Sequence, residues 1–73
     1  MTASVTAEYL MGLQEGRERL DQCGPSIAQE ELDGIQRAIR GFSAGSPVGQ
    51  MLRGERDFWV NQLNRNPAST NKS

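Results

Sequence analysis

The sequence predicts a small all-α protein, a helical hairpin extended to a three-helix bundle and followed by a disordered C-terminal tail. Three observations support this fold class. Apolar residues recur at helical spacing in three segments, no segment shows the alternation typical of a strand, and Gly, Pro and Ser separate the segments. Because 73 residues suffice for only one domain, we expect a single helical domain over residues 1–65 and a disordered tail over 66–73.

The first helix is expected to begin after Thr6, because a threonine hydroxyl is a suitable N-cap. Val5 then stands where a hydrophobic staple would contact the fourth helical residue. The apolar residues of this segment recur at spacings of three and seven: Leu10, Leu13 and Leu20. The helix should end at Cys23-Gly24-Pro25, since glycine favours a left-handed C-cap and proline cannot continue a helix.

The second helix is expected to begin at Ser26, because Gln29 three residues later completes the pattern of a capping box. Its apolar stripe is the clearest in the chain: Leu32, Ile35, Ile39 and Phe42. Acidic residues near its start and arginines near its end agree with the helix dipole. The stripe predicts that this helix supplies a large part of the core.

The third helix is expected to follow the turn Ser43-Ala44-Gly45, with Ser46 as N-cap and Pro47 as first helical residue. One side of this segment is expected to hold Val48, Met51, Leu52, Glu55, Phe58, Trp59, Gln62 and Leu63. Phe58 and Trp59 are consecutive and point about 100° apart, so they are not expected to be equally buried. We expect Trp59 in the core and Phe58 at a contact with a partner.

Glycine is unusually frequent within the predicted helices, where each costs about 1 kcal/mol relative to alanine. The six positions are Gly12, Gly16, Gly34, Gly41, Gly49 and Gly54. Three interpretations remain open: shorter helices, a chain that is loosely ordered when alone, or a close approach of two helix backbones. Gly12 and Gly16 lie four residues apart on one face, which suits a close crossing.

The net charge of −1 conceals an asymmetry between the two halves of the chain. Residues 1–34 hold two arginines against seven acidic residues, a net charge of −5. Residues 35–73 hold six basic residues against two acidic ones, a net charge of +4. Such halves pair within one chain, pair across a dimer, or present one sign to a partner.

The composition offers little for catalysis, and we expect a non-enzymatic protein without cofactor or metal. The chain has no histidine, so the usual general base near neutral pH is missing. Cys23 has no basic neighbour in sequence that would activate its thiol, and the carboxylates lack the spacing of a calcium loop or a di-iron site. With one cysteine, no signal-peptide pattern and no apolar run of about 18 residues, we expect a soluble, cytoplasmic protein that does not enter membranes.

A partner protein is the expected supplement to a marginal core, because a chain of this size buries only about 60% of its unfolded surface. Neither a disulfide nor a zinc site is available as a brace. We therefore expect a protein-binding module of the inhibitor, adaptor or chaperone type, such as phages encode, and a homodimer. The expected contact residues lie mainly on the third helix and are of types enriched at interfaces: Met51, Arg53, Arg56, Phe58, Trp59 and, from the second helix, Arg40.

Nucleic acid is the alternative partner. The second helix, the turn and the third helix have the order of a helix-turn-helix, with Arg53 and Arg56 placed to meet phosphates or base edges. Nucleic-acid-binding domains are typically strongly basic, whereas this chain is slightly acidic. The start of the third helix, Pro47 to Gln50, is also mostly apolar. Protein therefore remains the preferred partner class.

Overall fold

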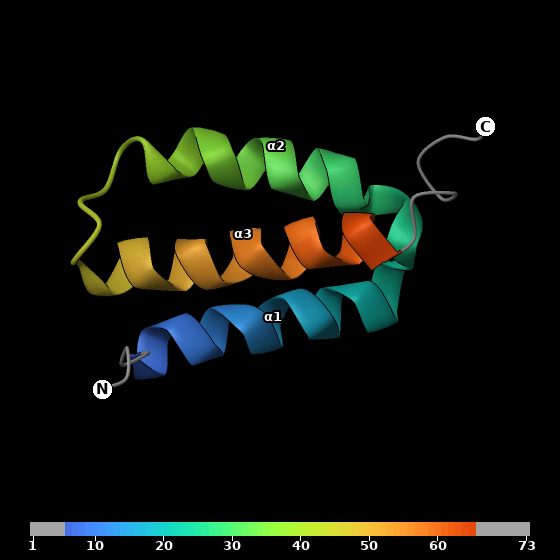
Figure 1. Cartoon of the computed structure of the whole chain (residues 1–73), viewed down its shortest axis with the longest axis horizontal. Helices are drawn as coiled ribbons and strands as arrows, with labels where there is room; N and C mark the ends of the chain where they lie inside the picture. Colours follow the sequence, from blue (N-terminus) through green and yellow to red (C-terminus); the bar gives the residue numbers. More distant parts are fainter. Residues whose placement is uncertain (1–5, 66–73) are drawn as a thin grey trace.

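The computed structural model describes residues 6–65, and these residues form three α-helices and one short 3₁₀ turn. The elements are α1 (Ala7–Cys23), η1 (Pro25–Ile27), α2 (Ala28–Ile39) and α3 (Pro47–Arg65). In Figure 1, α3 lies between α1 and α2; α1 and α3 run in the same direction, and α2 runs in the opposite one. The predicted all-α bundle is confirmed, while the predicted tail 66–73 and the Val5 staple lie outside the described residues.

Both ends of α1 are those the sequence predicts. The Thr6 hydroxyl oxygen accepts a hydrogen bond of 3.1 Å from the backbone N–H of Tyr9, as an N-cap does. At the other end Gly24 has a φ of 87°, a conformation that side-chain-bearing residues rarely adopt. Its N–H donates to the carbonyl oxygen of Leu20 at 2.7 Å. The helix therefore ends at Cys23, before Pro25.

The predicted capping box of α2 is wrong. Ser26 lies inside the 3₁₀ turn η1, and α2 begins two residues later, at Ala28, without a side-chain cap. The Gln29 side chain donates instead to Asp33 at 3.0 Å. The reason is that the chain starts to coil directly after Gly24, so Ser26 never takes the extended conformation that an N-cap requires.

The predicted stripe of α2 is confirmed for three of its four residues. Leu32 and Ile35 are buried, and Ile39 packs against them. The prediction is wrong for Phe42, which follows the end of the helix and is exposed. After Ile39 the N–H groups of Gly41 and Phe42 bond carbonyl oxygens three residues back, so the chain no longer keeps the helical period that would aim Phe42 at the core.

The start of α3 is confirmed. The Ser46 hydroxyl oxygen accepts a hydrogen bond of 3.0 Å from the N–H of Gly49, and the hydroxyl donates to the carbonyl oxygen of Ser43 at 2.9 Å. Pro47 occupies the first helical position, where its missing N–H has no partner to lose. The serine thus caps α3 and also ties it to the preceding turn.

Glycines allow α1 and α3 to meet backbone against backbone. A Cβ atom built on Gly12 would overlap the Met51 carbonyl oxygen and lie 2.9 Å from the Glu55 nitrogen. A Cβ on Gly54 would overlap the Tyr9 carbonyl oxygen and lie 3.1 Å from the Gly12 Cα. Of the three interpretations that the sequence left open, the close approach is the correct one for this pair.

The described part of the chain has a small core, formed chiefly between α2 and α3. Its buried hydrophobic residues are Ala28, Leu32, Ile35 and Trp59. Trp59 is only 1% exposed, as predicted, and is the largest fully buried side chain. Around it pack the partly buried Leu20, Ile27, Ile39, Leu52, Phe58 and Leu63. By contrast, the only buried residues of α1 are two glycines, Gly12 and Gly16.

Candidate protein-binding surface

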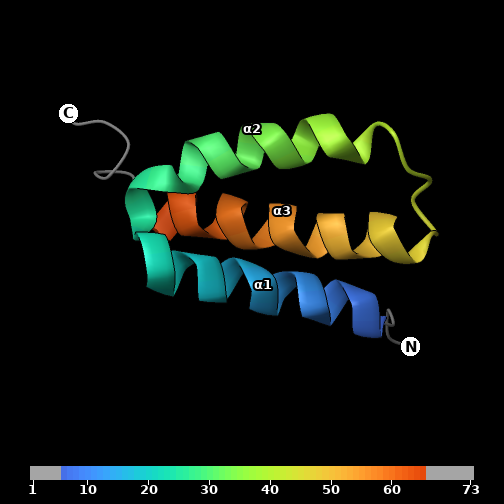
Figure 2. The same cartoon turned by 180° about the vertical axis from the view of Figure 1, so that it is seen from behind.

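One end of the bundle displays large apolar side chains to solvent. It comprises the start of α1, the segment after α2 and the start of α3, which lie together in Figure 2. The exposed fractions of four side chains there range from 44% to 51%, and we call these residues the apolar end: Leu10, Met11, Phe42 and Val48. Single exposed apolar residues are ordinary on protein surfaces, so it is their grouping at one end that makes this region a candidate contact site.

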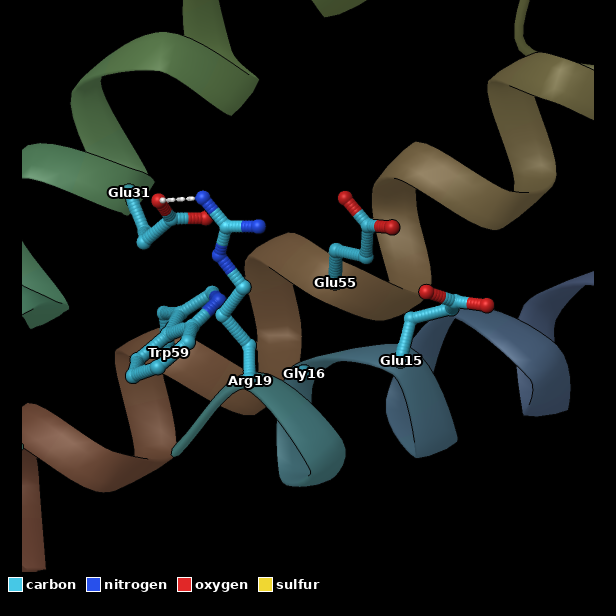
Figure 3. Close-up of a pocket in the computed structure, with 6 residues that line it drawn as sticks. All are labelled: Glu15, Gly16, Arg19, Glu31, Glu55 and Trp59. Atoms are coloured by element: carbon cyan, nitrogen blue, oxygen red, sulfur yellow. Dashed lines mark hydrogen bonds and ion pairs between the residues drawn. The ribbon is translucent and has the colours of Figure 1, made fainter. Parts of the chain in front are cut away.

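A hollow of about 220 Å³ is lined by residues of all three helices, and each helix contributes a glutamate to it. The lining residues, which define the glutamate hollow, are Glu15, Gly16, Arg19, Glu31, Glu55 and Trp59. Figure 3 shows Arg19 extending beside the Trp59 ring toward Glu31, to which it donates at 3.3 Å. Gly16 and the Trp59 side chain also line the hollow. The absent side chain of Gly16 makes room for the Phe58 ring on α3, so that α1 packs close to α3 at this level.

The charges of the glutamate hollow are not balanced, because three carboxylates surround one guanidinium. Glu55 is half-buried, and burial raises the pKa of its carboxyl group above the ordinary value. The negative charges of Glu15 and Glu31 raise this pKa further, while Arg19 acts in the opposite direction. A positive charge brought into the hollow would therefore be favourable.

A second polar group joins α1 to α3 elsewhere. The Tyr9 hydroxyl donates to the Asp57 carboxylate at 2.5 Å, and the Arg56 guanidinium donates to the same carboxylate at 3.1 and 3.2 Å. The bond to Asp57 is the main cause that raises the pKa of Tyr9, followed by burial. The hydroxyl, the carboxylate and the guanidinium bond one another, so this network stabilises the α1–α3 pair. It also occupies part of the hydrogen-bonding capacity of Arg56.

The structure does not gather the predicted contact residues into one face. Met51 and Arg53 are two positions apart on α3, which places them about 160° apart around the helix. The Arg53 Nε atom is buried and has no hydrogen-bond partner among the described residues. Arg40 is exposed just beyond the end of α2. The predicted combination of an apolar anchor with these arginines is therefore divided over the molecule.

Phe58 and Trp59 differ in accessibility, as their spacing predicts. Phe58 is half-buried. Its ring lies so close to α1 that a Cβ atom built on Gly16 would be 2.6 Å from it. It also meets the Trp59 ring edge-on, with 5.1 Å between the ring centroids. Part of its ring lines a separate open hollow of about 380 Å³ with Asn61, Gln62 and Arg65. Trp59, also a predicted contact residue, is buried against α2, and the described part of the chain leaves only 1% of it exposed.

Sequence reasoning missed the parts of this surface that depend on which helices are neighbours. Val48 was expected on the same side of the third helix as Trp59, yet it is exposed. Nothing in the spacing of Glu15, Glu31 and Glu55 shows that three helices bring them together. The signal that was available is the consecutive pair Leu10-Met11 in the first helix. Two adjacent large apolar residues on a helix cannot both face the same core.

Residues 6–65 show no group of acidic or cysteine side chains able to hold a metal ion. No helix within this range is both long and apolar enough to cross a membrane. Comparison of the chain with protein-family models, curated proteins and solved structures found no match.

Proposed function

We propose that this protein is a non-enzymatic protein-binding module that docks a partner on its apolar end. One observation carries the proposal: four large apolar side chains remain about half exposed at one end of the bundle, whereas the core of the described residues buries only four hydrophobic residues. Burial of apolar surface stabilises by roughly 25 cal/mol per Å². A partner that covers these side chains therefore supplies the stability that the small core lacks.

The chemistry of the apolar end suits adaptable recognition. Met11 has three rotatable bonds and a polarisable sulfur, so it packs against surfaces of different shape. Phe42 offers a large rigid ring on the connection between α2 and α3, where the backbone is not constrained by a helix. A module of this kind acts by covering a functional surface of its partner or by joining two partners, as inhibitors, adaptors and chaperones do.

Nucleic acid is not the partner that this geometry favours. The helices α2 and α3 lie side by side and run in opposite directions (Figures 1 and 2), whereas the helices of a helix-turn-helix cross at about 90–120°. The start of α3, which would enter a groove, is instead packed on the preceding turn: a Cβ on Gly49 would overlap the Ser43 carbonyl oxygen. If the affinity of the protein for its partner fell steeply with salt concentration, nucleic acid would again be the favoured partner.

The proposal is tested by two matched substitutions on α3. Val48→Ser alters the apolar end, whereas Val60→Ser makes the same change at an exposed position outside it. We expect a tagged chain to capture a partner in fixed stoichiometry from an extract of its own cells, identified by mass spectrometry. Val48→Ser should lose this partner and Val60→Ser should keep it. Equal capture by both variants would refute a binding site at the apolar end.

A homodimer is the form in which this surface would cover itself. Association of two copies makes the melting temperature depend on protein concentration. We expect the melting temperature to fall on dilution if the apolar ends of two copies meet, and Val48→Ser to abolish that dependence. A melting temperature that stays constant over about a hundredfold dilution excludes a dimer that the fold requires.

A further inference from the structure

Helical register connects the apolar end to the glutamate hollow. Met11 precedes Glu15 by four residues on α1, and Met51 precedes Glu55 by four residues on α3, so each methionine lies one helical turn from its glutamate on the same face. Because α1 and α3 run in the same direction, both methionines lie on the side of the hollow nearer to the apolar end. Val48 extends this row by a further turn.

This surface carries uncompensated negative charge within the described residues. Arg19 is the one basic residue of the hollow, and it pairs with Glu31. Glu15 and Glu55 form no ion pair with a described residue, although Glu55 is half-buried. A half-buried carboxylate that forms no ion pair is unfavourable to the free protein. A cationic side chain from outside would relieve this cost.

The spacing between the apolar and acidic parts defines the chemistry of the ligand. Residues four apart on a helix are about 5–6 Å apart, so the methionine row and the glutamate pair are separated by one helical turn. An amphipathic helix with Leu or Ile followed one turn later by Lys or Arg presents the same spacing. Helices of this type bind in methionine-lined grooves by their apolar faces.

We propose that this surface binds a basic amphipathic helix of another protein, whose apolar side chains pack on Met11, Met51 and Val48. A lysine or arginine of that helix enters the glutamate hollow and bonds Glu15 and Glu55. The inference rests on the proposed function and adds the chemical class of the partner. A second copy of the chain fits less well, because a basic side chain of one copy in the hollow of the other is a head-to-tail contact, which does not close into a symmetric dimer.

The test uses three synthetic peptides of about 18 residues, each long enough to form a helix. All three carry leucine at helical spacing; their polar faces are made of Lys, Gln or Glu. Binding of the labelled peptides to the full chain is measured by fluorescence anisotropy. We expect the Leu/Lys peptide to bind, the Leu/Gln peptide to bind at least about tenfold more weakly, and the Leu/Glu peptide not to bind.

Two double variants with equal charge change locate the site. Glu15→Gln with Glu55→Gln removes the two unpaired carboxylates, and Glu18→Gln with Glu30→Gln removes two exposed ones outside the hollow. The first should weaken the Leu/Lys peptide by about tenfold or more, and the second should change its affinity less than about twofold. Val48→Ser should also weaken it, whereas Val60→Ser should not.

Several results would overturn the inference. These are failure of the Leu/Lys peptide to bind, equal binding of the Lys and Glu peptides, equal effects of the two double variants, or self-association of the chain that Glu15→Gln with Glu55→Gln abolishes. The proposed function fails on a different result, namely equal capture of the cellular partner by Val48→Ser and Val60→Ser. If capture of the cellular partner depends on Val48 but the chain does not bind basic peptides, the proposed function stands and the basic amphipathic helix is refuted as the partner.

Discussion

Glu55 carries a carboxylate at the point where all three helices approach one another. Its neighbours are Glu15 from α1 and Glu31 from α2, with Arg19 as the opposing charge. Because burial and like charges raise its pKa, the folded protein binds this proton more tightly than the unfolded chain does. The contribution of Glu55 to the free energy of unfolding is therefore fully present at low pH and is lost as the pH rises through the raised pKa.

Glu55→Gln is therefore expected to stabilise the protein at pH 7. The gain should stay below about 1 kcal/mol, since solvent screens a half-exposed charge. The measurement is urea denaturation of both proteins from pH 7 down to pH 4. The difference in unfolding free energy should shrink as the pH falls, because the wild-type carboxyl becomes neutral like the amide. A difference that does not depend on pH would contradict the assignment of this pKa shift.

At the scale of the element, α1 is held on α3 by backbone proximity more than by side-chain burial. The described part of α1 buries no large side chain fully, yet Gly12 and Gly54 bring the two helix axes close enough for backbone atoms to touch. Close approach brings many atom pairs into van der Waals contact, and their attraction energies add up although each one is small. The glycines that lower the helix propensity of α1 and α3 are therefore also what joins these helices.

Gly12→Ala is expected to destabilise the protein by about 1–3 kcal/mol, because its Cβ would overlap backbone atoms of α3 that cannot move aside. Gly34→Ala is the matched control, since a Cβ there meets nothing within 4 Å. That substitution should stabilise by about 0.5–1 kcal/mol through helix propensity alone. Chemical denaturation of the two variants measures both effects. A Gly12→Ala protein as stable as Gly34→Ala would mean that the helices are not in backbone contact.

At the scale of the whole molecule, the fold depends on very little buried apolar surface. One tryptophan joins α2 to α3 and lines the glutamate hollow beside α1. A domain below about 80 residues rarely draws more than about 3–5 kcal/mol from a single core. We therefore expect the free protein to be marginally stable, and under the proposed function a partner would add stability at the apolar end.

Trp59→Ala is expected to unfold the chain at 25 °C. Truncation of a buried aromatic residue costs about 3–5 kcal/mol, which is comparable to the entire stability available here. The loss of helical signal in far-UV circular dichroism measures the effect. Val60→Ala, an exposed position one residue away, should leave the spectrum and the melting transition unchanged. A Trp59→Ala protein with a cooperative melting transition near that of the wild type would show that the core extends beyond this residue.

Helix ends were predictable wherever one residue and its immediate neighbours provide the hydrogen bonds or the backbone conformation that the end of the helix needs. Thr6 and Ser46 cap their helices as predicted, and Gly24 ends α1. Prediction failed where two local patterns competed: coiling directly after Gly24 displaced the Ser26 cap, and the early end of α2 turned Phe42 to solvent. The burial of Trp59 was predictable from its place on the apolar line of α3, because that line must face another helix.

The spacing of the apolar residues, the helix caps and the helix-breaking residues thus predicted three helices, their order and the buried tryptophan. All of these depend on residues only a few positions apart in the chain. The glutamate hollow, the apolar end and the contact of Gly12 with Gly54 join positions about forty residues apart in the chain. No local preference encodes them, because they depend on how far apart the helices lie and in which rotation each one faces its neighbour. Those quantities follow from side-chain packing across α1, α2 and α3, and the candidate binding surface exists only after that packing is complete.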